Sequence, residues 1–232
     1  MIKDLFSAAT TTLIACAALQ PNPVAAAEES AANQYMHQAD FKELAARFED
    51  PSRAEWQKPE KTIASLGSLD GKTVADVGAG TGYFSFPIAK QAAKVIAIDI
   101  DQRFLDYIAQ KKQTQKIGYN IETRLTEPDS SGLKAGEADM VLIVDTYHHI
   151  EGRIEYLEKL KTCLRKDGVL VTIDFKKMKT PPGPPVELRV AEEQVESELK
   201  SAGFIIVSAD KDLLPYQYII RARRSESIRG AL

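Results

Sequence analysis

The sequence is poor in cysteine, and this scarcity excludes several kinds of site. Its 232 residues include two cysteines, Cys16 and Cys163. They do not form a CxxC pair, so neither a zinc ribbon nor a thioredoxin-like redox motif is indicated. A site that binds arsenic through several thiols is disfavoured for the same reason. Cys163 lies at helical spacing from Leu157 and Leu160 and is followed by Leu164. We therefore interpret it as a small core residue.

An excess of charge and a long apolar run are also missing. The formal net charge is −3, so nothing in the composition favours nucleic acid as a partner. No apolar run reaches the roughly 20 residues of a transmembrane helix, and no transmembrane span is expected. Apolar residues make up 44% of the chain, which suffices for the core of one α/β domain. The oligomeric state is not indicated.

The first 27 residues have the layout of a secretory signal peptide. Lys3 precedes an uncharged apolar stretch at 5–19, and three alanines stand at 25–27. We therefore expect cleavage near Ala27 and export, to the periplasm in a bacterium. A lipoprotein anchored at Cys16 is the alternative, because the residues before that cysteine resemble a lipobox. Retention of the segment as a tether is a third interpretation.

Residues 28–58 are predicted to form an N-terminal helical extension. Its first part, 28–36, is interpreted as a flexible leader. Three apolar residues at helical spacing then indicate an amphipathic helix: Phe41, Leu44 and Phe48. His37 and Trp56 either cover a ligand pocket as part of a lid or serve in ordinary packing.

The segment 59–222 alternates between strands and helices. Strands are expected at 73–77, 94–99, 120–125, 140–144, 169–174, 204–207 and 216–220. Helices are expected at 84–93, around 104–108, at 154–164 and at 190–201. This alternation predicts a Rossmann-like, doubly wound α/β domain with helices on both faces of a mostly parallel sheet. The last two strands are predicted to form a hairpin, which makes the C-terminal strand antiparallel, and 223–232 is expected to be a tail.

A glycine-rich turn joins the first strand to the following helix. Gly78, Gly80 and Gly82 let the backbone turn tightly and approach a ligand closely. Asp99 ends the second strand, where an acid can accept hydrogen bonds from both hydroxyls of a ribose. A glycine-rich loop after strand one and an acid ending strand two together predict an adenosine-containing ligand.

The spacing of this loop distinguishes between cofactors. A dinucleotide fingerprint has GxGxxG, whereas this loop has GxGxG followed by Tyr83. Asp76 precedes the loop, and its charge would repel a pyrophosphate but suits an ammonium and a sulfonium. Residues 73–99 resemble motifs I and II of the class I S-adenosylmethionine-dependent methyltransferases. The resemblance extends over 59–222, which would be a seven-stranded methyltransferase domain, and the segment 143–150 resembles the end of strand four in the branch that acts on small molecules.

The resemblance implies a cofactor site for S-adenosyl-L-methionine. Its residues would be Asp76, Gly78, Ala79, Gly80, Gly82, Asp99, Ile100, Asp129 and Asp145. The glycines would line the methionine end, and Asp99 would hold the ribose. Either Glu127 or Asp129 would lie by the adenine. Asp145 would face the amino group or the acceptor, or else cap the following helix, and Asp76 could also simply cap the glycine loop.

Three residues after strand four are candidates for catalysis: Tyr147, His148 and His149. One of them is expected to face the acceptor and another to pack, and a histidine could serve as base when the acceptor must lose a proton. No third ligand accompanies the histidines, so no metal is predicted. The interpretation is therefore a methyltransferase acting on a small molecule. A catalytically silent, exported adenosyl-ligand-binding protein and an NAD-linked oxidoreductase are the alternatives.

Overall fold

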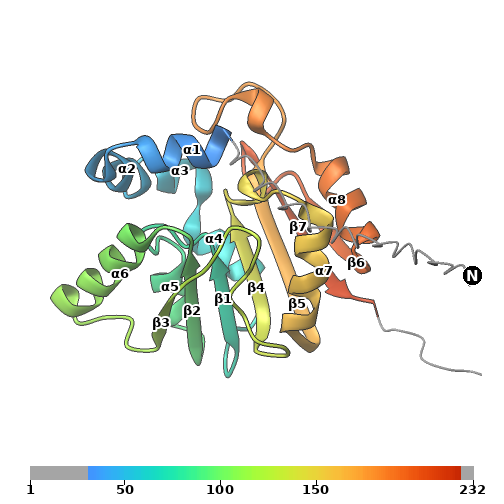
Figure 1. Cartoon of the computed structure of the whole chain (residues 1–232), viewed down its shortest axis with the longest axis horizontal. Helices are drawn as coiled ribbons and strands as arrows, with labels where there is room; N and C mark the ends of the chain where they lie inside the picture. Colours follow the sequence, from blue (N-terminus) through green and yellow to red (C-terminus); the bar gives the residue numbers. More distant parts are fainter. Residues whose placement is uncertain (1–30, 226–232) are drawn as a thin grey trace, which may run out of the picture.

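The structure, a computed structural model, describes residues 31–225. The predicted export signal, with Cys16 and the cleavage position, lies outside the described residues. The sheet has seven strands in the order β3-β2-β1-β4-β5-β7-β6 (Figure 1). Their bounds are β1 Thr73–Val77, β2 Lys94–Asp99, β3 Ile121–Leu125, β4 Ala138–Val144, β5 Leu164–Phe175, β6 Phe204–Asp210 and β7 Gln217–Arg224. Strands β1 to β5 pair in parallel, and β7 runs antiparallel to both of its neighbours, so the predicted fold class is confirmed.

Helices cover both faces of this sheet. Their bounds are α4 Pro59–Ser65, α5 Ser85–Ala89, α6 Gln102–Gln115, α7 Arg153–Cys163 and α8 Glu192–Ser201, with short 3-10 turns η1 Tyr147–His149 and η2 Val186–Leu188. Within β4, Met140 and Leu142 face α4, α5 and α6, whereas Val141 and Ile143 face α7 and α8. The strand is buried on both sides, which explains its continuous apolar sequence.

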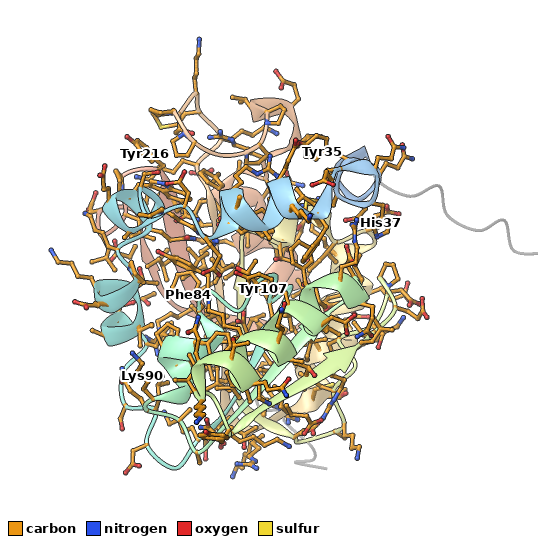
Figure 2. The ribbon with its side chains drawn as sticks, turned by 90° about the vertical axis from the view of Figure 1, so that its left-hand side faces the viewer. Tyr35, His37, Phe84, Lys90, Tyr107 and Tyr216 are labelled. Atoms are coloured by element: carbon orange, nitrogen blue, oxygen red, sulfur yellow. The ribbon has the colours of Figure 1, made fainter. Side chains whose placement is uncertain are left out.

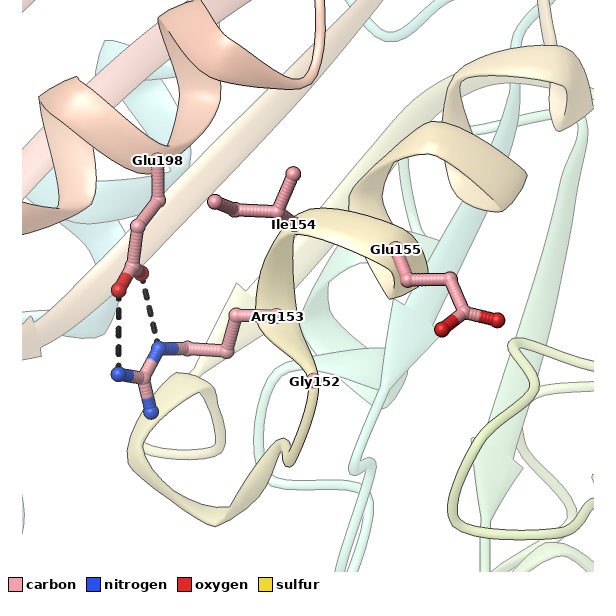
Figure 3. Close-up of a pocket in the computed structure, with 5 residues that line it drawn as sticks. All are labelled: Gly152, Arg153, Ile154, Glu155 and Glu198. Carbon is pink, nitrogen blue, oxygen red and sulfur yellow. Dashed lines mark hydrogen bonds and ion pairs between the residues drawn. The ribbon is translucent and has the colours of Figure 1, made fainter.

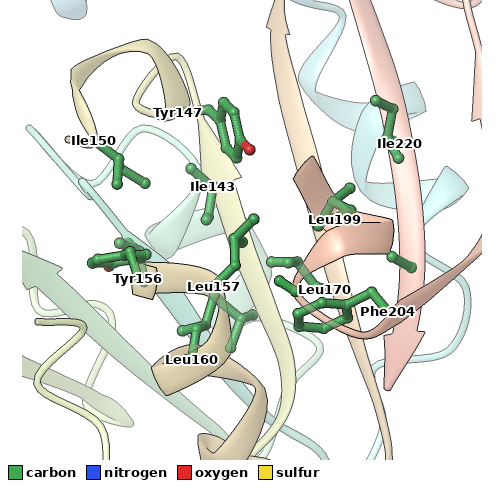
Figure 4. Packing of buried hydrophobic residues seen from close by; sticks show 14 of the residues in the cluster. Ile143, Tyr147, Ile150, Tyr156, Leu157, Leu160, Leu170, Leu199, Phe204 and Ile220 are labelled. Carbon is green, nitrogen blue, oxygen red and sulfur yellow. The ribbon is translucent and has the colours of Figure 1, made fainter. Parts of the chain in front are cut away.

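The core under α7 and α8 includes one of the candidate catalytic residues. Leu157 and Leu160 of α7, Leu199 of α8 and Ile143 of β4 are fully buried there, as is the ring of Tyr147 (Figure 4). Cys163 also is buried, as its helical spacing predicted.

Three further helices cross the carboxyl ends of the strands: α1 Ala31–Gln38, α2 Phe41–Phe48 and α3 Arg53–Gln57 (Figure 1). We call residues 31–58 the lid. Asp40 caps α2 by accepting from the backbone N–H groups of Lys42 and Glu43. The lid packs on α6, where the Phe41 ring lies 5.2 Å from Phe104 (Figure 2 shows α6 beneath the lid helices).

The structure differs from the sequence prediction in the bounds of several elements, including the following three. The helix α1 occupies most of the predicted flexible leader. Helix α5 is shorter than the predicted 84–93. Strand β7 continues to Arg224, where that residue pairs with Phe204 of β6, so the sheet extends two residues beyond the predicted domain end at 222.

Candidate active site

The glycine-rich loop lies against the ends of β2 and β4. The N–H groups of Gly78 and Ala79 both donate to the carbonyl of Ile98, each at 2.9 Å. Gly78 has φ +73°, and a Cβ there would lie 2.2 Å from Oγ1 of Thr146. Only glycine fits this position, because a side chain would have both an unfavourable φ and a collision with Thr146. The glycine pattern therefore reflects a real close approach of two chain segments.

Asp99 fastens this loop to the end of β2. One carboxylate oxygen accepts from the N–H of Gly80 at 2.8 Å, and the other accepts from the N–H of Asp101 at 3.0 Å. A carboxylate has about four lone-pair positions, so acceptor capacity remains for the two hydroxyls of a ribose. Burial raises the pKa of Asp99 to about 6. Ile100 follows directly and is half-buried.

Asp76 is the most deeply buried acid of the loop region, at 2% exposure. It accepts a hydrogen bond from the hydroxyl of Ser85 at 2.6 Å. Burial raises its pKa to about 6, and the nearby charge of Asp99 adds to this effect. The side chain thus joins β1 to the start of α5 and places a buried carboxyl beneath the glycine loop.

Asp145 lies at the end of β4, where three side chains converge on it. Gln57 of α3 donates to Oδ2 at 2.9 Å, Arg53 lies 3.5 Å from the same oxygen, and Gln217 of β7 donates to Oδ1. Burial raises the pKa of Asp145 to about 6, against the opposing charge of Arg53. Its backbone has φ +53°, which is strained for a residue other than glycine and is typical of functional positions.

His148 and Asp174 form a buried pair beside this cluster. The Nδ1 atom of His148 lies 3.0 Å from both carboxylate oxygens of Asp174, the next-to-last residue of β5. The His148 side chain is 4% exposed and that of Asp174 is fully buried. Burial alone would lower the pKa of His148, but the charge and hydrogen bonds of Asp174 outweigh it and raise that pKa. Since a carboxylate only accepts, Nδ1 carries a proton, and in the neutral form of the ring Nε2 has the lone pair.

His149 points to a different partner. Its Nδ1 atom lies 2.9 Å from Oδ1 of Asn33 on α1, and the Asn33 amide donates to the His149 carbonyl at 3.3 Å. Burial, reinforced by the neighbouring His148, lowers the pKa of His149 to about 3, so the ring is neutral and Nδ1 donates to the amide oxygen. The two histidines therefore have different tasks, because His148 is held by the sheet and His149 holds the lid.

Two other predicted site residues lie away from these groups. The Tyr147 ring is fully buried in the core, and its hydroxyl donates to Glu198 of α8 at 2.6 Å. This contact assigns Tyr147 to packing. The Asp129 side chain is 82% exposed and lies 3.9 Å from Lys159. It does not approach Asp76, Asp99 or Asp145 through any contact that the structure describes.

Two surface cavities lie at the start of α7. One, of about 370 Å³, is lined by Gly152, Arg153, Ile154, Glu155 and Glu198 (Figure 3). It contains the Arg153–Glu198 ion pair, but its lining includes neither the glycine loop nor either histidine. The other, of about 400 Å³, is lined by Asn33, His149 and Asp129 among others. Neither includes the glycine loop, over which the lid lies: Phe48 is the nearest side chain to a Cβ built on Gly80.

The groups at this edge fit an S-adenosyl compound. Two buried carboxyls, Asp76 and Asp99, and the partly buried Asp145 lie around the loop, which suits a ligand with an ammonium, a sulfonium and two ribose hydroxyls. The hydroxyl of Thr81, within the loop itself, is buried without a hydrogen-bond partner among residues 31–225. A buried polar atom of this kind commonly forms its hydrogen bond with a ligand or a water molecule. Over the same residues, no group of three or more metal-ligating side chains could hold a metal ion.

Comparison with known proteins agrees with this geometry. A family model described as a methyltransferase domain matches residues 75–172. An S-adenosylmethionine-dependent methyltransferase from Aquifex aeolicus superposes with a TM-score of 0.74 at 28% identity, over 80% of this chain and 98% of that one. The fold and the site define an S-adenosylmethionine-binding methyltransferase domain. The chain contains a class I S-adenosylmethionine-dependent methyltransferase domain, whose methyl donor is S-adenosyl-L-methionine.

Curated relatives are similar over part of their length. The ubiquinone biosynthesis O-methyltransferase of Actinobacillus pleuropneumoniae is 28% identical over 56% of this chain and 60% of its own length. The tRNA U34 carboxymethyltransferase of Cellvibrio japonicus is 29% identical over 51% of this chain and 37% of its own. The chain thus spans less than two thirds of these relatives. The fold alone is also shared with magnesium protoporphyrin IX methyltransferase of Synechocystis with bound S-adenosylmethionine, at 22% identity, with a TM-score of 0.56 over 73% of this chain and 79% of that one.

Sequence reasoning missed several residues of the site. Asp174 carries the same signal as Asp99, an acid ending a predicted strand, and could have been found by applying that rule to β5. Arg53 and Gln57 stand one helical turn apart in the predicted extension, but no pattern in the sequence connects them with Asp145, 88 residues beyond Gln57.

Proposed function

We propose that the protein transfers a methyl group from S-adenosyl-L-methionine to a hydroxyl group of a small molecule, with His148 as the base. The observation that carries this proposal is the His148–Asp174 pair, which lies beside Asp145 at the carboxyl ends of neighbouring parallel strands. Ligands of open α/β sheets bind at this edge. The relative from ubiquinone biosynthesis is an O-methyltransferase, which supports an oxygen acceptor.

The residues that would hold the cofactor are those of the glycine loop together with Asp99 and Asp145. When bound, this group supplies a methyl on a sulfonium, which is already activated toward a nucleophile. The protein therefore has to position the acceptor and remove its proton, and positioning alone can contribute roughly 7–11 kcal/mol. The lid excludes water from the same space, because Phe48 and Arg53 lie over the glycine loop.

His148 is suited to accept the acceptor's proton at Nε2. Asp174 holds Nδ1–H, which fixes the tautomer and stabilises the charge that the ring gains when Nε2 is protonated. Asp174 in turn accepts the backbone N–H groups of His148 and Phe175, at 3.2 and 2.7 Å, so its carboxylate is immobilised. Asp174 is a positioning residue in this mechanism and does not itself touch the acceptor.

A panel of small acceptors tests this proposal. Phenols, aliphatic alcohols and amines of similar size are incubated with the protein and S-adenosylmethionine, and products are identified by mass spectrometry. We expect methylation of hydroxyl acceptors, and a loss of at least tenfold in turnover for His148→Ala, which is about 1.4 kcal/mol of barrier. Methylation confined to amines, with full turnover in His148→Ala, would contradict the assignment of an oxygen acceptor and a histidine base.

We also propose export, since residues 1–27 have the layout of a secretory signal. Among the helices of residues 31–225, none is long and apolar enough to cross a membrane. Mass spectrometry of the protein from its native host tests the proposal: a mature N-terminus at Glu28 supports it. A mass that includes residues 1–27 contradicts cleavage, and a lipid-modified Cys16 favours the anchored form.

A further inference from the structure

Arg53 lies between the glycine loop and Asp145. Its guanidinium carbon is 4.1 Å from the centre of the Tyr83 ring, and Nη2 is 3.5 Å from Oδ2 of Asp145. Its other donors reach the Phe48 carbonyl, at 2.9 Å, and the Gln57 amide oxygen. The side chain is only 14% exposed although it belongs to a five-residue helix of the lid. A guanidinium buried over a ligand loop is seldom placed there for packing alone, because its burial is unfavourable unless it is paired.

The charges at this place match one part of the predicted ligand. The amino-acid end of S-adenosylmethionine has one carboxylate and one ammonium, so it needs one cation and one anion. Arg53 acts electrostatically on Asp76, Asp145 and Tyr83, which places its charge at the loop that the resemblance assigns to this end of the cofactor. A guanidinium binds a carboxylate through two parallel hydrogen bonds, which an ammonium cannot reproduce.

We propose that Arg53 binds the carboxylate of the cofactor's amino-acid end, and that its ion pair with Asp145 is a latch that this end of the cofactor replaces. The ligand carboxylate takes over the guanidinium, and the ligand ammonium takes over Asp145. The charges balance before and after the exchange. This inference rests on the proposed function, since it concerns the same cofactor.

The exchange has a consequence for the lid. In the structure described here, Arg53 and Gln57 connect α3 directly to the end of β4. With the cofactor bound, α3 would be held through the ligand instead. Because Trp56 lies in the same short helix, its contacts with the Phe175 and Tyr216 rings, at 5.4 and 6.5 Å, would change with the exchange.

Trp56 is the single tryptophan of the sequence, so intrinsic fluorescence reports on α3. The test titrates the protein with S-adenosylhomocysteine, which has the amino-acid end, and with 5′-methylthioadenosine, which lacks it, while calorimetry measures both affinities. We expect S-adenosylhomocysteine to change Trp56 emission and methylthioadenosine to bind without doing so. Arg53→Met should weaken S-adenosylhomocysteine at least tenfold and leave methylthioadenosine within twofold.

Arg47→Met is the matched control, because this lid guanidinium contacts Tyr35 and the ring of Phe48, and it has no described contact with Asp145 or Tyr83. It should leave both affinities unchanged. Arg53→Lys, which keeps the charge but not the two-pronged geometry, should give an intermediate loss, and it tests the proposal if Arg53→Met fails to fold.

The outcomes separate the inference from the proposed function. If the wild-type protein binds neither ligand, the cofactor assignment itself fails. If S-adenosylhomocysteine binds wild type and Arg53→Met equally, or if Arg53→Met weakens both ligands alike, the role of Arg53 is overturned while the cofactor assignment stands. An unchanged Trp56 emission at saturating S-adenosylhomocysteine would overturn the latch.

Discussion

The carboxylate of Asp174 holds Nδ1 of His148 at 3.0 Å in a place that is almost fully buried. If His148 is the base, turnover requires its neutral form and rises with pH through its raised pKa. Asp174→Asn removes the charge that raises this pKa, so the midpoint of the kcat profile should move to lower pH. Turnover should also fall at least tenfold, about 1.4 kcal/mol, because the tautomer is no longer fixed.

The kcat profile of both proteins from pH 5 to 9 checks this. A profile with an unchanged midpoint would mean that another group limits turnover. Lower turnover without a shifted midpoint would not support His148 as the base, since a structural defect could also lower turnover.

His149→Ala should have a different effect from His148→Ala. Because His149 is neutral and tied to Asn33, its removal is expected to loosen α1 without removing the base. Hydrogen exchange over residues 31–38 should become faster, while kcat stays within about threefold of wild type, or within ~0.7 kcal/mol of barrier. If exchange is unaltered and turnover is lost, the two histidines have been assigned the wrong way round.

Asp99→Asn should weaken cofactor binding by about 1.5–3 kcal/mol, the contribution of hydrogen bonds to a charged acceptor. The asparagine keeps one oxygen for the glycine loop, so the fold should persist. Asp139→Asn is the control, since this acid lies at the opposite end of the sheet, where it accepts from the N–H of Thr73. Titration calorimetry with S-adenosylhomocysteine measures the affinity of each variant. Equal affinities in the two variants would remove Asp99 from the site.

The free energy of unfolding of the cofactor-free protein should vary with pH because of the titration of Asp76. Its pKa is raised by burial from 3.8 to about 6, so the folded state binds the proton more tightly than the unfolded state. The stability that this group contributes is complete below pH 3.8 and is lost as pH rises through 6. At about 1.4 kcal/mol per unit, the loss is of the order of 2–3 kcal/mol.

Asp76→Asn isolates this contribution, because asparagine has the shape of the protonated acid and does not titrate. The difference in free energy of unfolding between variant and wild type should shift in favour of the variant between pH 4.5 and 7.5. Urea unfolding at several pH values measures it. A difference that does not vary with pH would show that Asp76 keeps an ordinary pKa in the folded protein.

The sequence predicted the parts of this protein that depend on local pattern. The β1 and β2 bounds agree with the predicted ones, because short apolar strands bounded by turns have few alternatives. The meeting of the glycine loop with Asp99 was predictable, because a turn after strand one and an acid ending strand two lie at the same edge of a parallel sheet, and the N–H of Gly80 donates to Asp99. The difference between His148 and His149 was not readable, since consecutive residues in a turn point in directions that only their partners, Asp174 and Asn33, decide.

The lid was the least predictable part. Helix α1 has little amphipathic pattern and was interpreted as a flexible leader. In the structure, Arg103 of α6 donates to the carbonyl of Met36 in α1, at 3.2 Å, and to that of Ala39 just after the helix, at 3.4 Å. The contacts of Arg53 and Gln57 with Asp145 join distant parts of the chain. Such tertiary contacts depend on packing and charge in three dimensions, and no periodicity in the sequence predicts them.

The central claim is that the chain is an enzyme that moves a methyl group from S-adenosylmethionine to a small molecule. The most direct measurement is transfer of a tritiated methyl to the small-molecule fraction of an extract of the host cell envelope. The account predicts labelled product with the wild-type protein and at least tenfold less with His148→Ala. Tight binding of S-adenosylhomocysteine together with no labelled product from any fraction would contradict it, and would make the protein a binder of the cofactor.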